Sequence, residues 1–280
     1  MGNTLLIGSC EPFSGKSALV LGLARHLLSE GRTVRFGKPL ATSLEWTAKG
    51  SPLPDPLIDD DVRFVGTTLG IDETRLIPSL HLLSPETADT RLRQGNLDAG
   101  TGLEMLLNDL QNDQDSFTML EAAGSLHEGL MYGLSLVQLA QGLDAPVILV
   151  HLWQDSRSVD ALLAAQHQLG DRLAGVVLNA VTPDEVEELN QHVVPALQAL
   201  GLKVFGVMPR SPLLRSVTVG ELVRRLDARV ICCKERLELL VETLSIGAMN
   251  VNSAMEFFRR RRNMAVVTGA DRTDIQLAAL

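Results

Sequence analysis

The chain has 280 residues, 45% of them hydrophobic and only 4% aromatic, so it is long enough for two domains with aliphatic cores. Such cores are typical of parallel sheets covered by helices. A net charge of −9 argues against a protein that binds nucleic acid or anionic membranes over a general surface. Because the sequence has no signal-peptide pattern and no apolar run of membrane-spanning length, we expect a cytoplasmic protein.

The N-terminal stretch contains the three parts of a phosphate-binding loop. An apolar strand is predicted over residues 4–7, a turn ending in Gly15-Lys16-Ser17 follows, and a helix is predicted over residues 17–29. Backbone N–H groups at such a helix N-terminus attract phosphate oxygens, the lysine reaches the outer phosphates, and the hydroxyl ligates Mg²⁺. The loop therefore predicts nucleotide binding.

The loop does not follow the strict pattern G-x-x-x-x-G-K-[ST]. Cys10 stands where the first glycine belongs, and the nearest upstream glycine is Gly8. An ordinary strand-to-helix turn capped by Ser14 is the alternative interpretation. The position of the loop, between a buried N-terminal strand and a helix, favours nucleotide binding.

Short β-rich runs alternate with helical patterns along the following residues, which indicates parallel strands joined by crossovers. Strands are predicted over residues 33–36, 117–121, 145–150, 174–179 and 203–207, and helices over residues 85–93, 102–111, 156–169 and 183–200. The sequence thus predicts an α/β fold, a P-loop NTPase-type parallel sheet flanked by helices, over residues 1–210.

Polar residues end or follow three of these strands: Lys38, Glu121 and Asn179. Open α/β sheets bind ligands at the carboxyl ends of their strands. Glu121 has the chemistry of a metal ligand or a water-positioning group, with a solvated strand end as the alternative. Asn179 offers the donor and acceptor that an adenine edge requires, although an Asx turn that closes the strand explains it equally well.

Three acids, Asp59-Asp60-Asp61, open a helix predicted over residues 62–69. They can oppose the positive end of the helix dipole, or they can hold Mg²⁺ together with phosphate oxygens. Both interpretations stay open. Residues 43–57 have no clear period and are predicted to form a long loop, a candidate lid.

A second, smaller α/β unit is predicted over residues 212–280. Helices are expected over residues 219–226 and 252–262, and strands over residues 230–232 and 265–268. We expect this unit to be incomplete, because the sequence stops inside a predicted helix. The three cysteines, Cys10, Cys232 and Cys233, have no metal-ligand spacing and are expected to be buried, reduced thiols.

With these residues in place, residues 1–210 resemble the dethiobiotin synthetase-like P-loop family, which includes cobyrinic acid synthases and the N-terminal domain of long phosphotransacetylases. The resemblance rests on an ordered series of motifs: Gly15-Lys16-Ser17, Lys38-Pro39, Asp59–Asp61, Glu121-Ala122-Ala123-Gly124, Gly175–Asn179 and Gly206–Pro209. It implies ATP and Mg²⁺ as cofactors, with γ-phosphoryl transfer to a carboxylate or carbamate.

The resemblance also implies roles for single residues. Lys16 and Lys38 match phosphate-facing lysines and are the expected catalytic residues. Ser17, Glu121 and one of the three acids, for which we choose Asp60, match metal ligands. Residues expected to bind the nucleotide are Cys10, Glu11, Ser14, Gly15, Lys16, Ser17 and Asn179, the last as the adenine-reading residue. We expect Lys16 to be exposed.

The chain also departs from the family. True dethiobiotin synthetases have Thr-Glu where this chain has Pro12-Phe13, which offer no hydrogen bond to a substrate or phosphate. Residues 212–280 resemble the first part of a DRTGG domain, on Thr218-Val219, Ile246–Met249 and Thr268–Ile275. Such modules commonly accompany regulatory, nucleotide-sensing chains.

The sequence therefore predicts an ATP-binding regulatory protein whose nucleotide state is read by the second unit or by a protein partner. The alternatives are an ATP-dependent ligase or kinase acting on a small carboxylate or amine, and a degenerate P-loop scaffold. An incomplete second unit leaves an apolar face and an unpaired strand edge. A second copy with two-fold symmetry buries such surfaces most simply, and the resembled family is typically dimeric, so we expect a homodimer.

Overall fold

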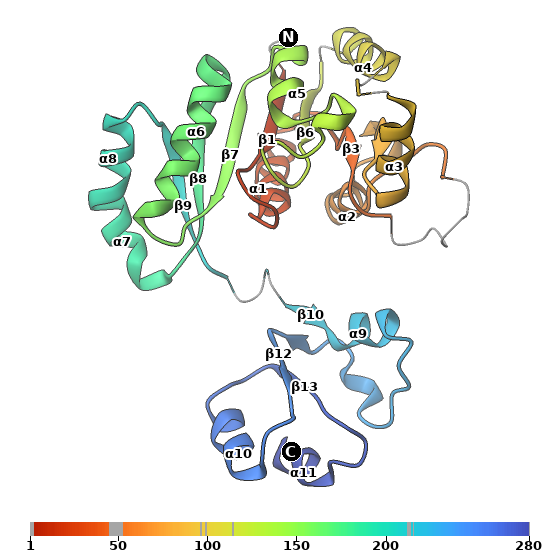
Figure 1. Ribbon diagram of the computed structural model, residues 1–280, viewed down its shortest axis with the longest axis vertical. Coiled ribbons are helices and arrows are strands. Elements are labelled where there is room, and N and C mark those ends of the chain that lie inside the picture. The colour runs from red at the N-terminus through yellow and green to blue at the C-terminus, as the bar shows by residue number, and fades with distance from the viewer. Residues whose placement is uncertain are drawn as a thin grey trace. The chain divides into compact units, whose positions relative to one another are not determined.

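The structure is a computed structural model that describes residues 3–44, 53–95, 97–98, 100–113, 115–211, 214 and 216–279. It divides into two compact units, Met1–Arg210 and Ser211–Leu280 (Figure 1). The central part of the candidate lid, residues 45–52, lies outside the described residues. No helix in the described ranges is long and apolar enough to cross a membrane.

The first unit is organised on a seven-stranded sheet in the order β4-β2-β6-β1-β7-β8-β9, in which all neighbours are parallel. The strands of this unit are β1 (Thr4–Gly8), β2 (Val34–Gly37), β3 (Leu40–Ala41), β4 (Leu76–Ile77), β5 (His81–Leu82), β6 (Phe117–Glu121), β7 (Val147–Leu152), β8 (Leu173–Val181) and β9 (Val204–Pro209). β3 and β5 pair separately from the main sheet. The expected parallel α/β sheet is confirmed.

Helices flank this sheet on both faces. They are α1 (Lys16–Ser29), α2 (Asp60–Leu69), α3 (Pro85–Gln94), α4 (Thr101–Asn112), α5 (Leu136–Leu143), α6 (Val159–Leu169), α7 (Val186–Glu188) and α8 (Val194–Ala199). Successive strand residues enter two separate cores, because side chains alternate across a strand. Ile7 packs with residues of α1 and α2, whereas Leu6 packs with residues of α4, α5 and α6.

The helix expected over residues 183–200 is interrupted. A π-helical segment, Leu189–Val193, separates α7 from α8. Pro195 lies in the first turn of α8 and has no N–H to donate to the preceding turn. The missing bond explains why the helix widens at this point.

The second unit contains two short sheets. Its elements are β10 (Val217–Thr218), α9 (Val219–Arg225), β11 (Leu240–Val241), β12 (Thr243–Ile246), α10 (Val251–Arg259), β13 (Met264–Val267) and α11 (Thr273–Ala279). β10 pairs with β11 in antiparallel orientation, and β12 pairs with β13 in parallel orientation.

The strand expected over residues 230–232 is wrong. The backbone there forms no strand, and Ile231 is 84% exposed. Asp227 and Cys233, which flank the run, have positive φ angles of 49° and 51°, so the chain turns at both ends. Cys232 and Cys233 are exposed rather than buried, which corrects the expectation of buried thiols for this pair.

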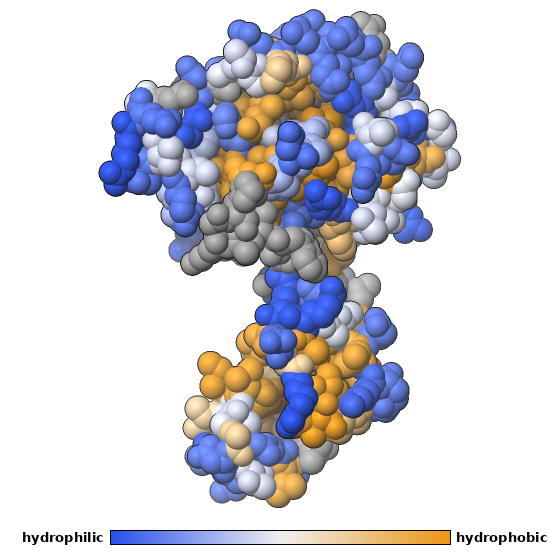
Figure 2. All heavy atoms as spheres, turned by 90° about the vertical axis from the view of Figure 1, so that its right-hand side faces the viewer, coloured by the Kyte–Doolittle hydropathy of each residue, from blue (hydrophilic) through white to orange (hydrophobic). Residues whose placement is uncertain are grey.

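Large apolar side chains are exposed on the second unit, and Figure 2 shows hydrophobic surface there. Three of them, Leu244, Ile246 and Val267, share one face of the β12–β13 sheet, because the register pairs Ile246 with Val267 and Leu244 stands two residues before Ile246. Their exposed fractions are 65%, 69% and 52%. This face of the β12–β13 sheet is therefore both apolar and exposed among the described residues.

Candidate functional site

The sheet register brings the expected site residues to one edge. β1 lies between β6 and β7, and the register pairs Ile7 with Glu121 and Leu152 with Asn179. The loop after β1 therefore begins beside the end of β6, and Asn179 lies two strands away on the other side. This is the carboxyl edge at which open α/β sheets bind ligands.

The loop leaves the N-terminus of α1 open. Gly15 is the N-cap residue, with φ 94°, and no side chain caps the helix. The alternative interpretation of a turn capped by Ser14 is therefore wrong: Ser14 is buried, and its Oγ has no hydrogen-bond partner in the described chain. A Cβ at Gly15 would lie 2.2 Å from Asn179 Nδ2, and L side chains rarely adopt this φ angle, so the position favours glycine. Uncapped N–H groups at a helix N-terminus are suited to an anion.

Lys16 is buried rather than exposed, which corrects the sequence-based expectation; 7% of its surface is exposed. Its Nζ donates to Ser9 Oγ at 3.2 Å and to the Gly124 carbonyl at 3.4 Å. Burial lowers the pKa of Lys16, although the carboxylate of Glu121 opposes this shift. A buried ammonium whose hydrogen-bond acceptors are neutral favours the approach of an anion.

Glu121 lies next to the first hydroxyl of α1. Ser17 Oγ donates to Glu121 Oε1 at 3.4 Å, whereas Oε2 is buried with no hydrogen-bond partner among the described residues. Only 2% of Glu121 is exposed, and burial raises its pKa to about 7. An orphaned carboxylate oxygen beside a hydroxyl fits the oxygen ligands that Mg²⁺ prefers.

A cluster of polar side chains surrounds Lys38, which is buried at the end of β2. Lys38 Nζ lies 2.9 Å from Asp61 Oδ2, 3.3 Å from Asp59 Oδ2 and 2.6 Å from Thr42 Oγ1. Burial acts to lower the pKa of Lys38, but the carboxylates of Asp59, Glu121 and Asp61 outweigh it, so the pKa is raised. Lys38 therefore stays charged at the same edge of the sheet as Lys16.

The three acids have different partners. Asp59 is the N-cap of α2 and accepts hydrogen bonds from the backbone N–H groups of Thr42 at 2.7 Å and Asp61 at 2.9 Å. Asp60 Oδ2 instead accepts from Ser43 Oγ at 2.9 Å. The two interpretations of these acids thus coexist: Asp59 caps a helix and also contacts Lys38. The structure brings Asp59 and Asp61, and not Asp60, to Lys38.

Asn179 lies against the loop. Its Nδ2 donates to the Ser14 carbonyl at 2.7 Å. This bond links the end of β8 to the residue before the N-cap of α1. The side chain is therefore near the loop, as expected for a nucleotide-binding residue, and it also holds the backbone of the loop.

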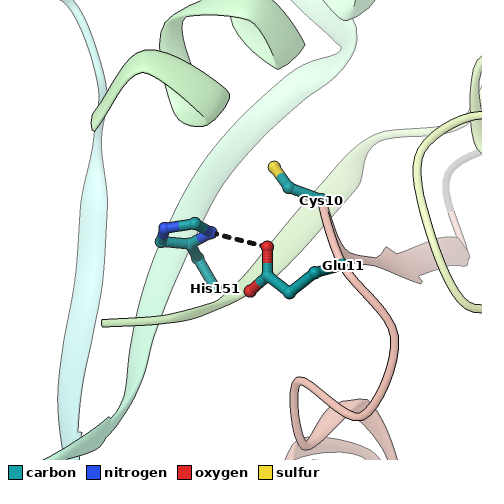
Figure 3. A group of neighbouring side chains, drawn as sticks. All are labelled: Cys10, Glu11 and His151. Atoms are coloured by element: carbon teal, nitrogen blue, oxygen red, sulfur yellow. Dashed lines mark ion pairs between the residues drawn. The ribbon is translucent and has the colours of Figure 1, made fainter. Parts of the chain in front are cut away.

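Sequence reasoning missed His151, which lies in β7 and faces Cys10 and Glu11 of the loop (Figure 3). Glu11 Oε1 accepts from the Leu152 N–H at 2.6 Å, and Glu11 Oε2 lies 3.1 Å from His151 Nδ1. The Glu11 side chain is thus turned toward β7. A polar residue inside an otherwise apolar strand was the only signal available for His151.

Comparison with known proteins identifies the family. A family model described as an AAA domain (AAA_26) matches residues 3–218, and a model described as a DRTGG domain matches residues 221–280. The chain belongs to the AAA_26 family. The expected combination of a dethiobiotin synthetase-like P-loop region and a DRTGG unit is confirmed for this AAA_26 protein.

Curated relatives of this AAA_26 protein fall into several groups. It is 25% identical to a phosphate acetyltransferase of Nitratidesulfovibrio vulgaris, over 100% of this chain and 39% of that one. It is 27% identical to the ATP-dependent dethiobiotin synthetase BioD of Pseudomonas aeruginosa, over 77% of this chain and 92% of that one. It is 29% identical to a hydrogenobyrinate a,c-diamide synthase of Mesorhizobium japonicum, over 75% of this chain and 41% of that one. The chain thus spans well under half of the phosphate acetyltransferase.

Proposed function

We propose that the first unit binds ATP with Mg²⁺ and that this binding serves a regulatory, nucleotide-sensing function. The observation that carries the proposal is the buried Glu121, whose Oε2 has no hydrogen-bond partner in the described chain although Ser17 Oγ lies 3.4 Å from Oε1. Buried polar atoms of folded proteins are nearly always satisfied, so a bound cation accounts for this one. The ATP dependence stated for the related BioD supports ATP as the nucleotide.

The proposed roles follow from the contacts. The N-terminus of α1 and Lys16 bind phosphate oxygens, because the helix is uncapped and the ammonium is buried. Ser17, Glu121 and one carboxylate of the acid cluster hold Mg²⁺, which neutralises phosphate charge when bound. Lys38 is held by Asp59 and Asp61, with its charge directed to the same edge.

A regulatory role is supported by two features. Phe13, where dethiobiotin synthetases carry a residue that can hydrogen-bond, is 96% exposed and offers no polar atom to a substrate. The second feature is the DRTGG domain matched over residues 221–280, a kind of module that we expect in nucleotide-sensing chains. The partner that reads the nucleotide state is the second unit or another protein, and we place the protein in the cytoplasm.

A second candidate function is an ATP-dependent ligase or phosphoryl transferase acting on a small carboxylate or amine. The observation that favours it is the pair of buried lysines, Lys16 and Lys38, at one sheet edge. Positively charged side chains on both sides of a transferred phosphoryl group are what such reactions require. This activity would release ADP in step with modification of the acceptor, whereas a sensor would bind ATP with slow or no turnover.

Calorimetric titration of the full chain with ATP, ADP and a non-hydrolysable analogue, each with and without Mg²⁺, tests the proposal. ATP should bind, and Mg²⁺ should raise the affinity for ATP. Binding of none of the nucleotides would leave only a P-loop scaffold. Turnover of ATP in the presence of a small carboxylate or amine would favour the second candidate.

Replacing Asn179 by alanine should weaken the binding of ATP by roughly 10-fold more than the binding of inorganic triphosphate. The difference is the loss of one hydrogen bond to the adenine, worth about 1–1.5 kcal/mol. Competition binding with the two ligands measures both affinities in the same variant. An equal loss for ATP and triphosphate would show that Asn179 acts only through its bond to the Ser14 carbonyl.

We also propose that the protein is a homodimer, with the apolar face of the β12–β13 sheet contributing to the contact. The full chain should sediment as a dimer, and the double substitution Leu244→Glu, Ile246→Glu should shift it to a monomer, since both side chains are exposed and neither supports the core. Leu226→Glu is the control, because Leu226 is exposed and caps the C-terminus of α9 rather than lying in β12 or β13. A parent chain that sediments as a monomer would contradict the proposal.

A further inference from the structure

A cluster of metal-ligating side chains lies between the loop after β1 and the end of β7 (Figure 3). Cys10 and Glu11 come from the loop, and His151 comes from the strand. The Cys10 Sγ, one Glu11 carboxylate oxygen and one His151 ring nitrogen all lie within 4.8 Å of one another. Thiolate, carboxylate and imidazole are the donor types of protein zinc sites.

His151 is the member of the cluster whose ring nitrogens lack a hydrogen bond in the described chain. It is 3% exposed, and neither ring nitrogen makes a hydrogen bond within the ranges that the structure describes. Its Nδ1 lies 3.1 Å from Glu11 Oε2, but the geometry is not that of a hydrogen bond. A buried polar group without a hydrogen bond is destabilising, so a group that satisfies it is expected.

Glu11 is already oriented for a ligand. Its Oε1 accepts the Leu152 N–H at 2.6 Å, which leaves Oε2 directed at His151. Backbone groups that fix a ligating carboxylate in this way are typical of metal sites.

Cys10 completes the set. Its Sγ donates to the Ala161 carbonyl at 3.6 Å, and burial, reinforced by the Glu11 carboxylate, raises the pKa of the thiol to about 12. The thiol therefore stays protonated unless a cation takes the place of its proton.

We propose that Cys10, Glu11 and His151 together bind one divalent transition-metal ion of the zinc class. Thiolate, carboxylate and neutral imidazole balance the two positive charges, so the complex is neutral, which suits a buried position. Zinc bonds of about 2.0–2.3 Å hold tetrahedral ligand atoms about 3.3–3.8 Å apart, so small side-chain rotations close the site. Binding releases the Cys10 proton to solvent, and the fourth position stays open to water.

The proposed metal would tie the loop that carries Cys10 and Glu11 to β7. This site differs in chemistry from the oxygen ligands Ser17 and Glu121, because sulfur and nitrogen donors select transition metals over Mg²⁺. The two sites can therefore be tested independently of one another.

The test uses Co²⁺ alone as the probe, with the full chain carrying Cys232→Ser and Cys233→Ser. These two exposed cysteines would bind metal themselves, and their removal leaves Cys10 as the only thiol of the chain. The chelator-treated protein should bind one equivalent of Co²⁺ with a thiolate-to-cobalt charge-transfer absorption. Zn²⁺ should displace the Co²⁺, whereas excess Mg²⁺ and the substitution Glu121→Gln should leave the absorption unchanged.

Variants in the same background assign the ligands. Cys10→Ser should abolish the charge-transfer absorption. His151→Ala should weaken Co²⁺ binding by at least about 100-fold, since even the loss of a residue that only orients a metal ligand costs roughly 10–100-fold in affinity. Circular dichroism reports whether each variant is folded. Even if a variant does not fold, the parent spectrum decides: absence of Co²⁺ binding, or binding without thiolate absorption, would overturn the proposal.

Discussion

Replacing Lys16 by alanine should lower the affinity for ATP by on the order of 100-fold and leave the protein folded. Charge-assisted hydrogen bonds to phosphate are worth about 1.5–3 kcal/mol, and about 1.4 kcal/mol corresponds to a factor of ten. The free energy of unfolding should not fall, because burial disfavours this ammonium in the protein without nucleotide, as its lowered pKa shows. Calorimetry and thermal unfolding of the same preparation measure the two quantities.

Lys203→Ala is the matched control, because Lys203 is an exposed lysine of the same unit, with its Nζ over the ring of Phe205. It should leave ATP affinity unchanged. An unchanged ATP affinity in Lys16→Ala would contradict the proposal that the loop after β1 binds the phosphates of ATP. An unfolded Lys16→Ala would instead show that the lysine is a structural member of the core.

Replacing Glu121 by glutamine should abolish the stimulation of ATP binding by Mg²⁺, because the substitution removes the buried negative charge and keeps the shape of the side chain. Metal binding requires the carboxylate, whose pKa is raised to about 7. The effect of Mg²⁺ on the parent chain should therefore grow as the pH rises from 6 to 8, a window set by about one pH unit on either side of that pKa. Titrations with ATP at fixed Mg²⁺ across this range measure it, with exposed Glu185→Gln as the control.

The same glutamate makes the stability of the nucleotide-free protein depend on pH. Its pKa is 4.5 in the unfolded reference and about 7 in the folded chain. Between these values the folded state holds a proton that the unfolded state has released, so the free energy of unfolding falls as the pH rises. The full loss is roughly 3 kcal/mol, and it should vanish in Glu121→Gln. A parent chain and a variant with the same pH profile would show that Glu121 is not buried as described.

The sequence predicted the parallel sheet well because the longer strands of the sheet are apolar runs that alternate with helical patterns along the chain. β6 begins and ends at the expected residues, 117 and 121, and α3 begins at the expected residue 85. The strand prediction for residues 230–232 rested on the same apolar pattern, but it was wrong. An apolar run becomes a strand only where a neighbouring strand pairs with it, and among the described residues no strand pairs with residues 230–232, which lie between two positive-φ residues.

The contacts of the site that join residues far apart in the sequence were harder to predict than the positions of residues at strand ends. His151 faces Glu11, which is 140 positions earlier in the chain, and no local pattern links them. The burial of Lys16 depends on how the loop folds back to the Gly124 carbonyl at the end of another strand. By contrast, Lys38, Glu121 and Asn179 were found from their places at strand ends, because parallel strands put those ends on one edge.

Calorimetric titration of the full chain with ATP, with and without Mg²⁺, tests the central claim most directly. One site per chain is expected, with ATP bound in both conditions and bound more tightly with Mg²⁺, because Lys16 and the open N-terminus of α1 bind phosphate while Ser17 and Glu121 bind the metal. Absence of binding of ATP, ADP and a non-hydrolysable analogue in both conditions would contradict the claim.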